Sequence, residues 1–264
     1  MIIIKMLLDN IKFALKTRKL WWFTATSRTR ARFAKTTLGS FWLGFSNLLS
    51  ILTLGVVYGT VFSVKDFNSY LIYLGIGLVV WNSICSSITS APLLFINNGS
   101  NIQNLKLRPI FYVFEEWAFQ IQTFFQSFVL VFFVLLFFKK DIFYNLILTS
   151  WMPFINLFIF LFWFPLVIAL ISLRFSDFAQ LVPIVLQLIF LISPILYKKE
   201  NLGDLNWITN INFIYIIIDS LRSTLISSDI NYNFQFFILF INSIGFLLSI
   251  IYLHFQSKKI PFLV

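Results

Sequence analysis

Long stretches without charge, separated by short charged segments, dominate the hydrophobic pattern of this sequence. A helix needs about 20 mostly apolar residues to cross a bilayer. Six windows reach that length, so the pattern predicts an all-α integral membrane protein with six transmembrane helices. The predicted spans cover residues 41–62, 70–92, 117–138, 144–172, 178–197 and 234–255.

Proline and length modify two parts of this pattern. Pro153 and Pro165 fall in the fourth predicted span and Pro183 in the fifth, where we expect bends that neighbouring helices can accommodate. The apolar stretch at 206–218 has only 13 residues, which is too short to cross. We therefore expect a re-entrant or interfacial piece between spans five and six.

The N-terminal segment combines a charged and an apolar helical stripe. Charged residues recur every three or four positions at Lys5, Asp9, Lys12, Lys16 and Lys19. This spacing predicts a basic amphipathic helix in the membrane interface, with Trp21 and Trp22 at headgroup depth. A surface helix packed on protein is the alternative. The charges also argue against a cleavable signal peptide.

Composition supports the membrane interpretation. Of the 264 residues, 59% are hydrophobic and 11% charged, and the mean hydropathy is +0.88. Soluble domains carry about a quarter charged residues. No repeat or linker divides the chain, so we expect one membrane domain over 1–264, with a basic segment at 1–35 preceding a bundle at 36–264.

Lys and Arg are distributed unevenly between the two sides of the predicted membrane. With the N-terminus inside, inner segments hold 14 of the 20 Lys and Arg but four of the ten acids. The positive-inside rule therefore predicts cytoplasmic termini. Four of these cations crowd before the first span: Arg28, Arg30, Arg32 and Lys35. Each contributes about 1 kcal/mol near an anionic leaflet, which is enough to anchor this segment.

Residues that support most catalysis are scarce. Cys85 and His254 are the only cysteine and histidine, so an intrachain disulfide is excluded and zinc or His-based catalysis is disfavoured. No GxxxxGK[ST] motif is present to bind ATP. Glu115 and Glu116 fall where acids suit a helix N-terminus. We expect no catalytic residue, metal site or cofactor in this chain, and the apolar spans argue against an ion-coupled pump.

The inner loop at 96–110 reads INNGSNIQNLKLRPI. Asn98-Gly99 is a turn signal, and Ser100 with Gln103 forms a capping-box pattern. Pro109 disfavours helix at Arg108, so we expect a short capped helix of about seven residues. Such a helix needs a packing partner, which is either its own bundle or a groove in a cytoplasmic protein.

The second inner loop, LRFSDFAQ at 173–180, is tight. Arg174 would lie at a helix C-terminus and Ser176 or Asp177 at the next helix N-terminus, where each charge suits the helix dipole. Helix capping and direct contact with a partner are both compatible with these positions.

Three stretches of the sequence are distinctive: RTRARFAKTTLGSFW at 28–42, GIGLVVW at 75–81 and RFSDFAQLVPIVLQLIFLISPILY at 174–197. All three resemble motifs of ABC type-2 permeases that export polysaccharide and polyol phosphate. Asn212 and Arg222 fall where that family has an Asn-Pro pair and a later Arg, although Phe213 replaces the proline. The similarity extends over nearly the whole chain in order.

The resemblance implies a homodimer of six-span chains with two ATP-binding subunits, in which ATP and Mg act. The implied substrate is a polyprenyl-linked glycan exported across a bacterial inner membrane, and no nucleic acid partner is implied. The alternatives are the same architecture with a small hydrophobic compound or drug as cargo, and a membrane enzyme acting on polyprenyl-linked sugars.

The resemblance also implies site residues. The ATPase-coupling residues would be Ser100, Asn101, Ile102, Gln103, Asn104, Leu105, Lys106, Leu107, Arg108, Arg174 and Asp177. The lipid-linked pyrophosphate would meet Arg28, Arg30, Arg32 and Lys35, unless these only anchor the topology. The outer gate, within paired re-entrant helices at 198–228 and the preceding turn, would include Ser193, Pro194, Tyr197, Asn212 and Arg222.

Overall fold

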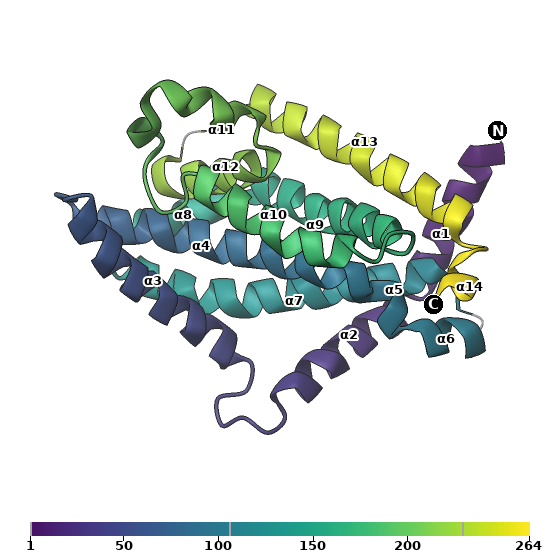
Figure 1. Ribbon diagram of the computed structural model, residues 1–264. Coiled ribbons are helices and arrows are strands. Elements are labelled where there is room, and N and C mark those ends of the chain that lie inside the picture. Colours follow the sequence, from purple (N-terminus) through teal and green to yellow (C-terminus); the bar gives the residue numbers. More distant parts are fainter. Residues whose placement is uncertain (1, 106, 229) are drawn as a thin grey trace.

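The computed structural model describes residues 2–105, 107–228 and 230–264, with side chains from residue 9 onward. Every regular element in this part of the chain is helical. Long helices run side by side as a bundle, and short helices gather at its two ends (Figure 1). We call these the α6 end, which also carries α1 and α14, and the α12 end.

Five helices of the described chain are long and apolar enough to cross a membrane. They agree with five of the six predicted windows, although several boundaries differ. These helices are α3 (Phe41–Val61), α4 (Phe67–Ser90), α7 (Pro109–Leu136), α9 (Trp151–Ser172) and α13 (Tyr232–Gln256).

Helix α4 forms the centre of the bundle and contacts α3, α7 and α9. It begins before the predicted residue 70 because Asp66 caps it, accepting hydrogen bonds from the Ser69 hydroxyl (2.6 Å) and the Ser69 N–H (3.1 Å). These two bonds hold the pKa of Asp66 below its usual value. At its other end α4 is followed directly by η1 (Ala91–Leu93) and α5 (Leu94–Asn97).

The fourth predicted span, 144–172, is divided into two helices. Helix α8 (Asp141–Leu148) ends before α9 begins at Trp151. At the break, the Thr149 and Ser150 hydroxyls both donate to the Asn145 carbonyl oxygen (2.7 and 3.0 Å). Hydroxyl groups that bond the backbone compete with helix propagation, and Pro153 is tolerated because it falls in the first turn of α9.

The fifth predicted span, 178–197, is helical only over α10 (Phe178–Ile192). Fifteen residues make a helix of about 22 Å, shorter than the hydrocarbon core. Ser193 adopts an extended conformation (ψ 132°) because Pro194 follows it, and this ends the helix.

The segment between α10 and α13 contains several short helices. In place of one apolar piece at 206–218, the chain forms η2 (Lys199–Asn206), α11 (Trp207–Ile211) and α12 (Phe213–Ser227). Asn212 separates the last two and caps α12, since its side-chain oxygen accepts from the Tyr215 N–H (3.1 Å). The break therefore follows from a capping residue, as helix N-termini require.

The N-terminal segment forms α1 (Ile2–Lys16) and α2 (Arg18–Phe33), and both contact the bundle. Trp21, Ala25 and Thr29 form a buried stripe on α2. Trp21 packs against Phe114 and donates its indole N–H to the Ala14 carbonyl (2.8 Å). This stripe is therefore a protein-packing face that buries Trp21, whereas Trp22 remains exposed.

Buried amides connect α9 to α13. Asn156 donates to the Gln235 side chain (3.1 Å), and Trp163 donates to the Asn242 side chain (2.9 Å). A Cβ at Gly245 would lie 2.6 Å from the Trp163 ring, so glycine is required for this approach. Close packing and interhelical hydrogen bonds are what hold helices together in lipid.

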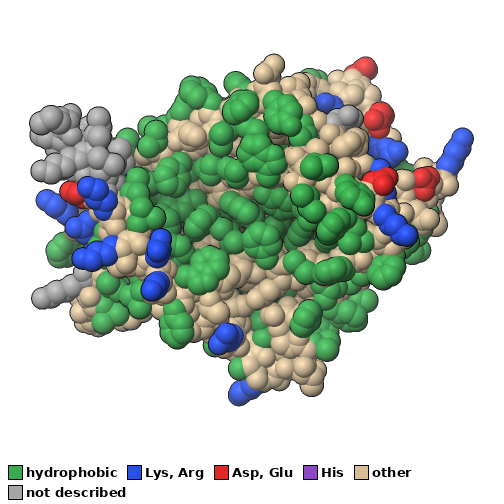
Figure 2. Space-filling model, turned by 180° about the vertical axis from the view of Figure 1, so that it is seen from behind, with side chains coloured by type: hydrophobic (Ala, Val, Ile, Leu, Met, Phe, Trp, Pro, Cys, Tyr) green, Lys and Arg blue, Asp and Glu red, His purple; other side chains and the backbone are tan. Residues whose placement is uncertain are grey.

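Charged side chains lie mostly toward the two ends of the bundle, and a few Lys or Arg lie on its projecting lower edge (Figure 2). Figure 2 shows hydrophobic side chains covering the middle of one face, with Lys and Arg prominent at one end and both signs mixed at the other. A wide apolar band between charged ends is what a membrane-spanning bundle requires.

Candidate functional site

The predicted loop helix is present as α6 (Gly99–Asn104), which has six residues. The capping-box prediction is wrong, because the helix begins at Gly99 with Asn98 rather than Ser100 in the N-cap position, and no side chain caps it. Gln103 instead donates to the backbone oxygens of Pro261 (3.2 Å) and Val264 (2.7 Å). The short helix is thus held by α14 (Ile260–Leu263) and the residue after it.

Helix α6 has one buried and one exposed side. Ile102 is 5% exposed and packs into the core, whereas Leu105 is 57% exposed. Leu105 directly follows the helix, and the exposed side chains within it are polar: Ser100, Asn101, Gln103 and Asn104. Lys106 lies outside the described residues. The outer side of α6 therefore offers a polar surface with one apolar side chain.

Arg108 follows this helix in an extended conformation, as the proline after it predicts. Its guanidinium donates to the Asp9 carbonyl (3.3 Å) and lies 5.0 Å from the Phe13 ring. Leu107 is half-buried against the core. Arg108 therefore holds α1 against the start of α7.

Arg174 and Asp177 lie in the tight turn between α9 and α10. Asp177 occupies the N-cap position of α10, as predicted, although its side chain makes no capping hydrogen bond. Arg174 is exposed and shares a cavity of about 280 Å³ with Lys259 and Leu263. Since α14 contacts both α6 and this cavity, it bridges the two predicted coupling loops.

The four cations before the first long helix differ in their surroundings. Arg28 forms an ion pair with Glu116 (2.6 Å) and lies 4.1 Å from the Phe119 ring. Arg30, Arg32 and Lys35 are exposed, at the end of α2 and in the linker to α3. This linker turns the chain outside the bundle (Figure 1). The segment therefore contains one internally paired cation and three accessible ones.

Glu116 is the centre of a small polar network. One carboxylate oxygen accepts from Arg28, and the other accepts from Ser90 (2.9 Å) and Gln120 (2.8 Å). Glu115 and Glu116 are the seventh and eighth residues of α7, so their expected place at a helix N-terminus is wrong. The acid at 116 instead joins α2, α4 and α7.

Arg222 is the largest fully buried side chain of the described chain, at 2% exposure. It donates to Asp219 (2.6 Å), to the Tyr215 hydroxyl (3.2 Å) and to the Pro194 carbonyl (3.1 Å). Its guanidinium also lies 3.7 Å from the centre of the Tyr73 ring. Buried charges are normally paired and hydrogen-bonded in this way.

The other predicted gate residues join the same cluster. Asn212 donates to the Ser193 hydroxyl (2.7 Å), and the Tyr73 hydroxyl contacts the carbonyl oxygens of Pro194 (2.9 Å) and Tyr197 (3.0 Å). We call this set the Arg222 cluster, comprising Tyr73, Ser193, Pro194, Tyr197, Asn212, Tyr215, Asp219 and Arg222. It fixes the turn after α10 to α4 and α12.

Comparison with known proteins defines the family. Residues 22–226, from α2 to the end of α12, match the ABC-2 type transporter family. The chain belongs to this family. No curated protein matches the sequence. The matched region contains both predicted coupling loops, the four cations and the Arg222 cluster.

Family membership establishes the general role of this ABC-2 permease. It is a multi-pass membrane transport subunit and not an enzyme, and permeases of this type work with ATP-binding subunits. The interpretation as a membrane enzyme acting on sugar lipids is therefore wrong.

Sequence reasoning missed several residues of the permease that the fold brings together. Tyr215 and Asp219 were missed, although they and the predicted Arg222 are four and three positions apart, a spacing that places all three on one helix face. That spacing could have identified the ion pair. Tyr73 and Glu116 carry no local signal, because their partners come from helices distant in sequence.

Proposed function

We propose that this ABC-2 permease is a homodimer of six-span chains that works with two ATPase subunits. Together they export a lipid-linked polysaccharide across a bacterial inner membrane, with both permease termini cytoplasmic. In this arrangement α10 and the turn after it form the fifth span, and η2 to α12 form the outer re-entrant helices. The proposed cargo rests on three exposed cations beside the first span, Arg30, Arg32 and Lys35.

These cations suit a cargo that carries phosphate. Arginine pairs with phosphate oxygens through two parallel hydrogen bonds, and lysine adds a point charge. Arg28 is already paired with Glu116, so it positions α2 and leaves the other three to meet the pyrophosphate of a lipid-linked glycan. The sequence motifs shared with polysaccharide exporters point to the same cargo.

Polar side chains on the exposed side of α3 and α4 support a path between two copies. Asn82 is exposed and donates to the side chain of Asn47 (2.6 Å), which in turn donates to Ser127. Ser46 and Ser50 are exposed on α3. Polar groups within membrane spans normally face other protein or water, so a second copy and a polar substrate account for this surface.

Reversing the three exposed cations tests the cargo contact. We expect Arg30→Glu, Arg32→Glu and Lys35→Glu together to reduce glycan export more than tenfold, because each lost charged hydrogen bond costs roughly 1.5–3 kcal/mol. The measurement is surface glycan per copy of permease in the membrane.

The matched control carries the same charge change at exposed lysines of the α12 end, namely Lys65, Lys140 and Lys198. Normal export by the first variant at normal membrane levels would refute the phosphate contact and leave only topology anchoring.

A small hydrophobic compound is the second candidate cargo. A cavity of about 620 Å³ between α7, α8 and α9 favours it, since aromatic and aliphatic residues such as Phe128, Phe132 and Trp151 form its walls. Export of such a compound by vesicles without glycan would support this alternative.

Cysteine accessibility tests the proposed orientation. In a Cys85→Ser background, cysteines at Lys140 and Lys198 should react with a membrane-impermeant maleimide added to intact cells. A cysteine at Leu105 should react only after the inner membrane is opened. Labelling of Leu105→Cys in sealed cells would invert the topology.

A further inference from the structure

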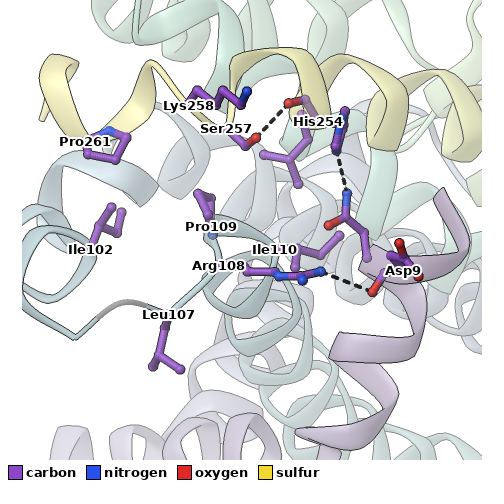
Figure 3. Close-up of a pocket in the computed structure, with 12 residues that line it drawn as sticks. Asp9, Ile102, Leu107, Arg108, Pro109, Ile110, His254, Ser257, Lys258 and Pro261 are labelled. Atoms are coloured by element: carbon purple, nitrogen blue, oxygen red, sulfur yellow. Dashed lines mark hydrogen bonds between the residues drawn. The ribbon is translucent and has the colours of Figure 1, made fainter. Parts of the chain in front are cut away.

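A pocket of about 440 Å³ lies behind α6, where four parts of the chain meet. Figure 3 shows α1 on one side, the end of α13 above, and the segment from Leu107 to Ile110 between them. Pro261 of α14 completes the wall. Ile102, Leu107 and Arg108 on its wall belong to the predicted coupling loop, but the pocket itself lies behind that loop and contains no residue of the Arg222 cluster.

Two cations line the pocket, Arg108 and Lys258. The ion pairs of the described chain join Arg28 to Glu116 and Arg222 to Asp219, so neither pocket cation has a carboxylate partner among the described residues. Among the described residues, Arg108 hydrogen-bonds to a neutral backbone oxygen, that of Asp9, and its guanidinium lies 5.0 Å from the Phe13 ring. The Asp9 carboxylate is the single acid on the wall, which leaves the pocket with net positive charge.

The remaining wall is divided by polarity. Asn10 and His254 lie within hydrogen-bonding distance (3.2 Å), and the Ser257 hydroxyl donates to the His254 carbonyl (2.7 Å). Ile102 and Leu253 supply a buried apolar floor. A ligand that fits this wall has an anionic group and an adjoining apolar part.

The position of the pocket selects among such ligands. Helix α1 is basic and amphipathic, a pattern typical of helices that lie in the membrane interface, and its residues Asp9 and Asn10 form one wall. Ile102 is on the buried side of α6, whereas Leu105 and Asn101 are exposed. With α1 in the interface, we place the pocket at headgroup depth, behind the side of α6 that is proposed to meet the ATPase.

We propose that this pocket binds the phosphate of an anionic inner-leaflet phospholipid, with the glycerol and upper acyl chain on the apolar floor. Arg108 and Lys258 hold the phosphate. The lipid thereby joins α1, the coupling loop and α13. This assignment rests on the proposed orientation of the permease but not on its cargo or its ATPase.

Native mass spectrometry of the purified permease alone tests the proposal. Phosphatidylglycerol is titrated, with phosphatidylcholine and inorganic phosphate as comparison ligands. We expect Arg108→Ala with Lys258→Ala to weaken phosphatidylglycerol binding about 25-fold, since each basic residue near a membrane surface contributes roughly a factor of five. Ser257→Trp should also block binding, while keeping both cations.

The matched control is Arg174→Ala with Lys259→Ala, which removes the same charges from the neighbouring cavity and should leave binding within about twofold. Equal binding by the wild type and the Arg108/Lys258 variant would overturn the proposal. So would displacement of the lipid by millimolar inorganic phosphate, which would indicate a free-phosphate site, or by the ATPase subunit, which would assign the pocket to docking.

Discussion

Asp219→Leu is expected to lower the free energy of unfolding of the permease by about 3–5 kcal/mol, because it leaves a buried cation without a charged partner. Arg222 is 2% exposed, and Asp219 is its only ion-pair partner among the described residues. The contacts of Arg222 to Tyr215 and Pro194 remain, but they are neutral and cannot replace a carboxylate.

Removing Arg222 instead of Asp219 should lower the free energy of unfolding by a smaller amount. In Arg222→Met the carboxylate of Asp219 is left, but its side chain is 44% exposed and can be hydrated. The double variant Asp219→Leu with Arg222→Met contains no unpaired buried charge. It should therefore be more stable than Asp219→Leu alone. A double-mutant cycle measures this difference as the coupling energy between Asp219 and Arg222.

Thermal unfolding in detergent, followed by tryptophan fluorescence, measures all three variants. A loss of 3–5 kcal/mol corresponds to a shift of roughly 10 °C in Tm for a chain of this size. Tyr73→Phe is the control, since it removes the hydroxyl contacts to Pro194 and Tyr197 while keeping the ring beneath Arg222, at a cost of about 1 kcal/mol. If Asp219→Leu were as stable as the wild type, the contacts of Arg222 to the Tyr73 ring and the Pro194 carbonyl would be enough to stabilise the buried cation.

The long helices could be predicted from the sequence because lipid allows few alternatives for an apolar stretch of 20 residues. The first window, 41–62, agrees with Phe41–Val61, and the last, 234–255, with Tyr232–Gln256. Helix α7 begins earlier than expected, at Pro109. The charges at Glu115 and Glu116 suggested a boundary, but Arg28 neutralises the second acid and the helix continues through it.

Breaks within apolar stretches could not be predicted because they depend on specific polar contacts. The split between α8 and α9 follows from hydroxyl contacts to Asn145, whose side chain in turn donates to the Leu225 carbonyl (2.9 Å). That contact exists only once α12 has packed on α8. Hydropathy does not register such a contact.

The candidate site was predicted in part. Resemblance supplied Ser193, Asn212 and Arg222, and the fold brings these three into one cluster. It did not supply Asp219 or Tyr73, although the ion pair to Asp219 follows from spacing. The capping role predicted for Ser100 is wrong because Asn98 takes the N-cap position of the helix. The Gln103 side chain is hydrogen-bonded to Pro261 of α14 instead, and this contact joins segments about 160 residues apart.

Leu105→Asp is expected to reduce co-purification of the ATPase subunit with the permease at least tenfold. Leu105, directly after α6, is a large apolar side chain with 57% exposure, while Ile102 of α6 is already buried within the chain. A helix that enters a groove is anchored by such apolar side chains, and burying a new carboxylate there without a partner costs several kcal/mol. Transport should fall with ATPase binding, since the permease has no ATP-binding motif of its own.

Leu205→Asp provides the matched control, because Leu205 is similarly exposed, at 53%, but lies in η2 at the α12 end. It should retain the ATPase in a pull-down from membranes at equal permease levels. Replacing Asn101–Leu107 by a Gly-Ser segment should abolish binding altogether, since it removes both α6 and the Gln103 contact to α14. If the Gly-Ser variant still binds the ATPase, docking must use Arg174 and the turn before α10, and α6 serves only to pack its own bundle.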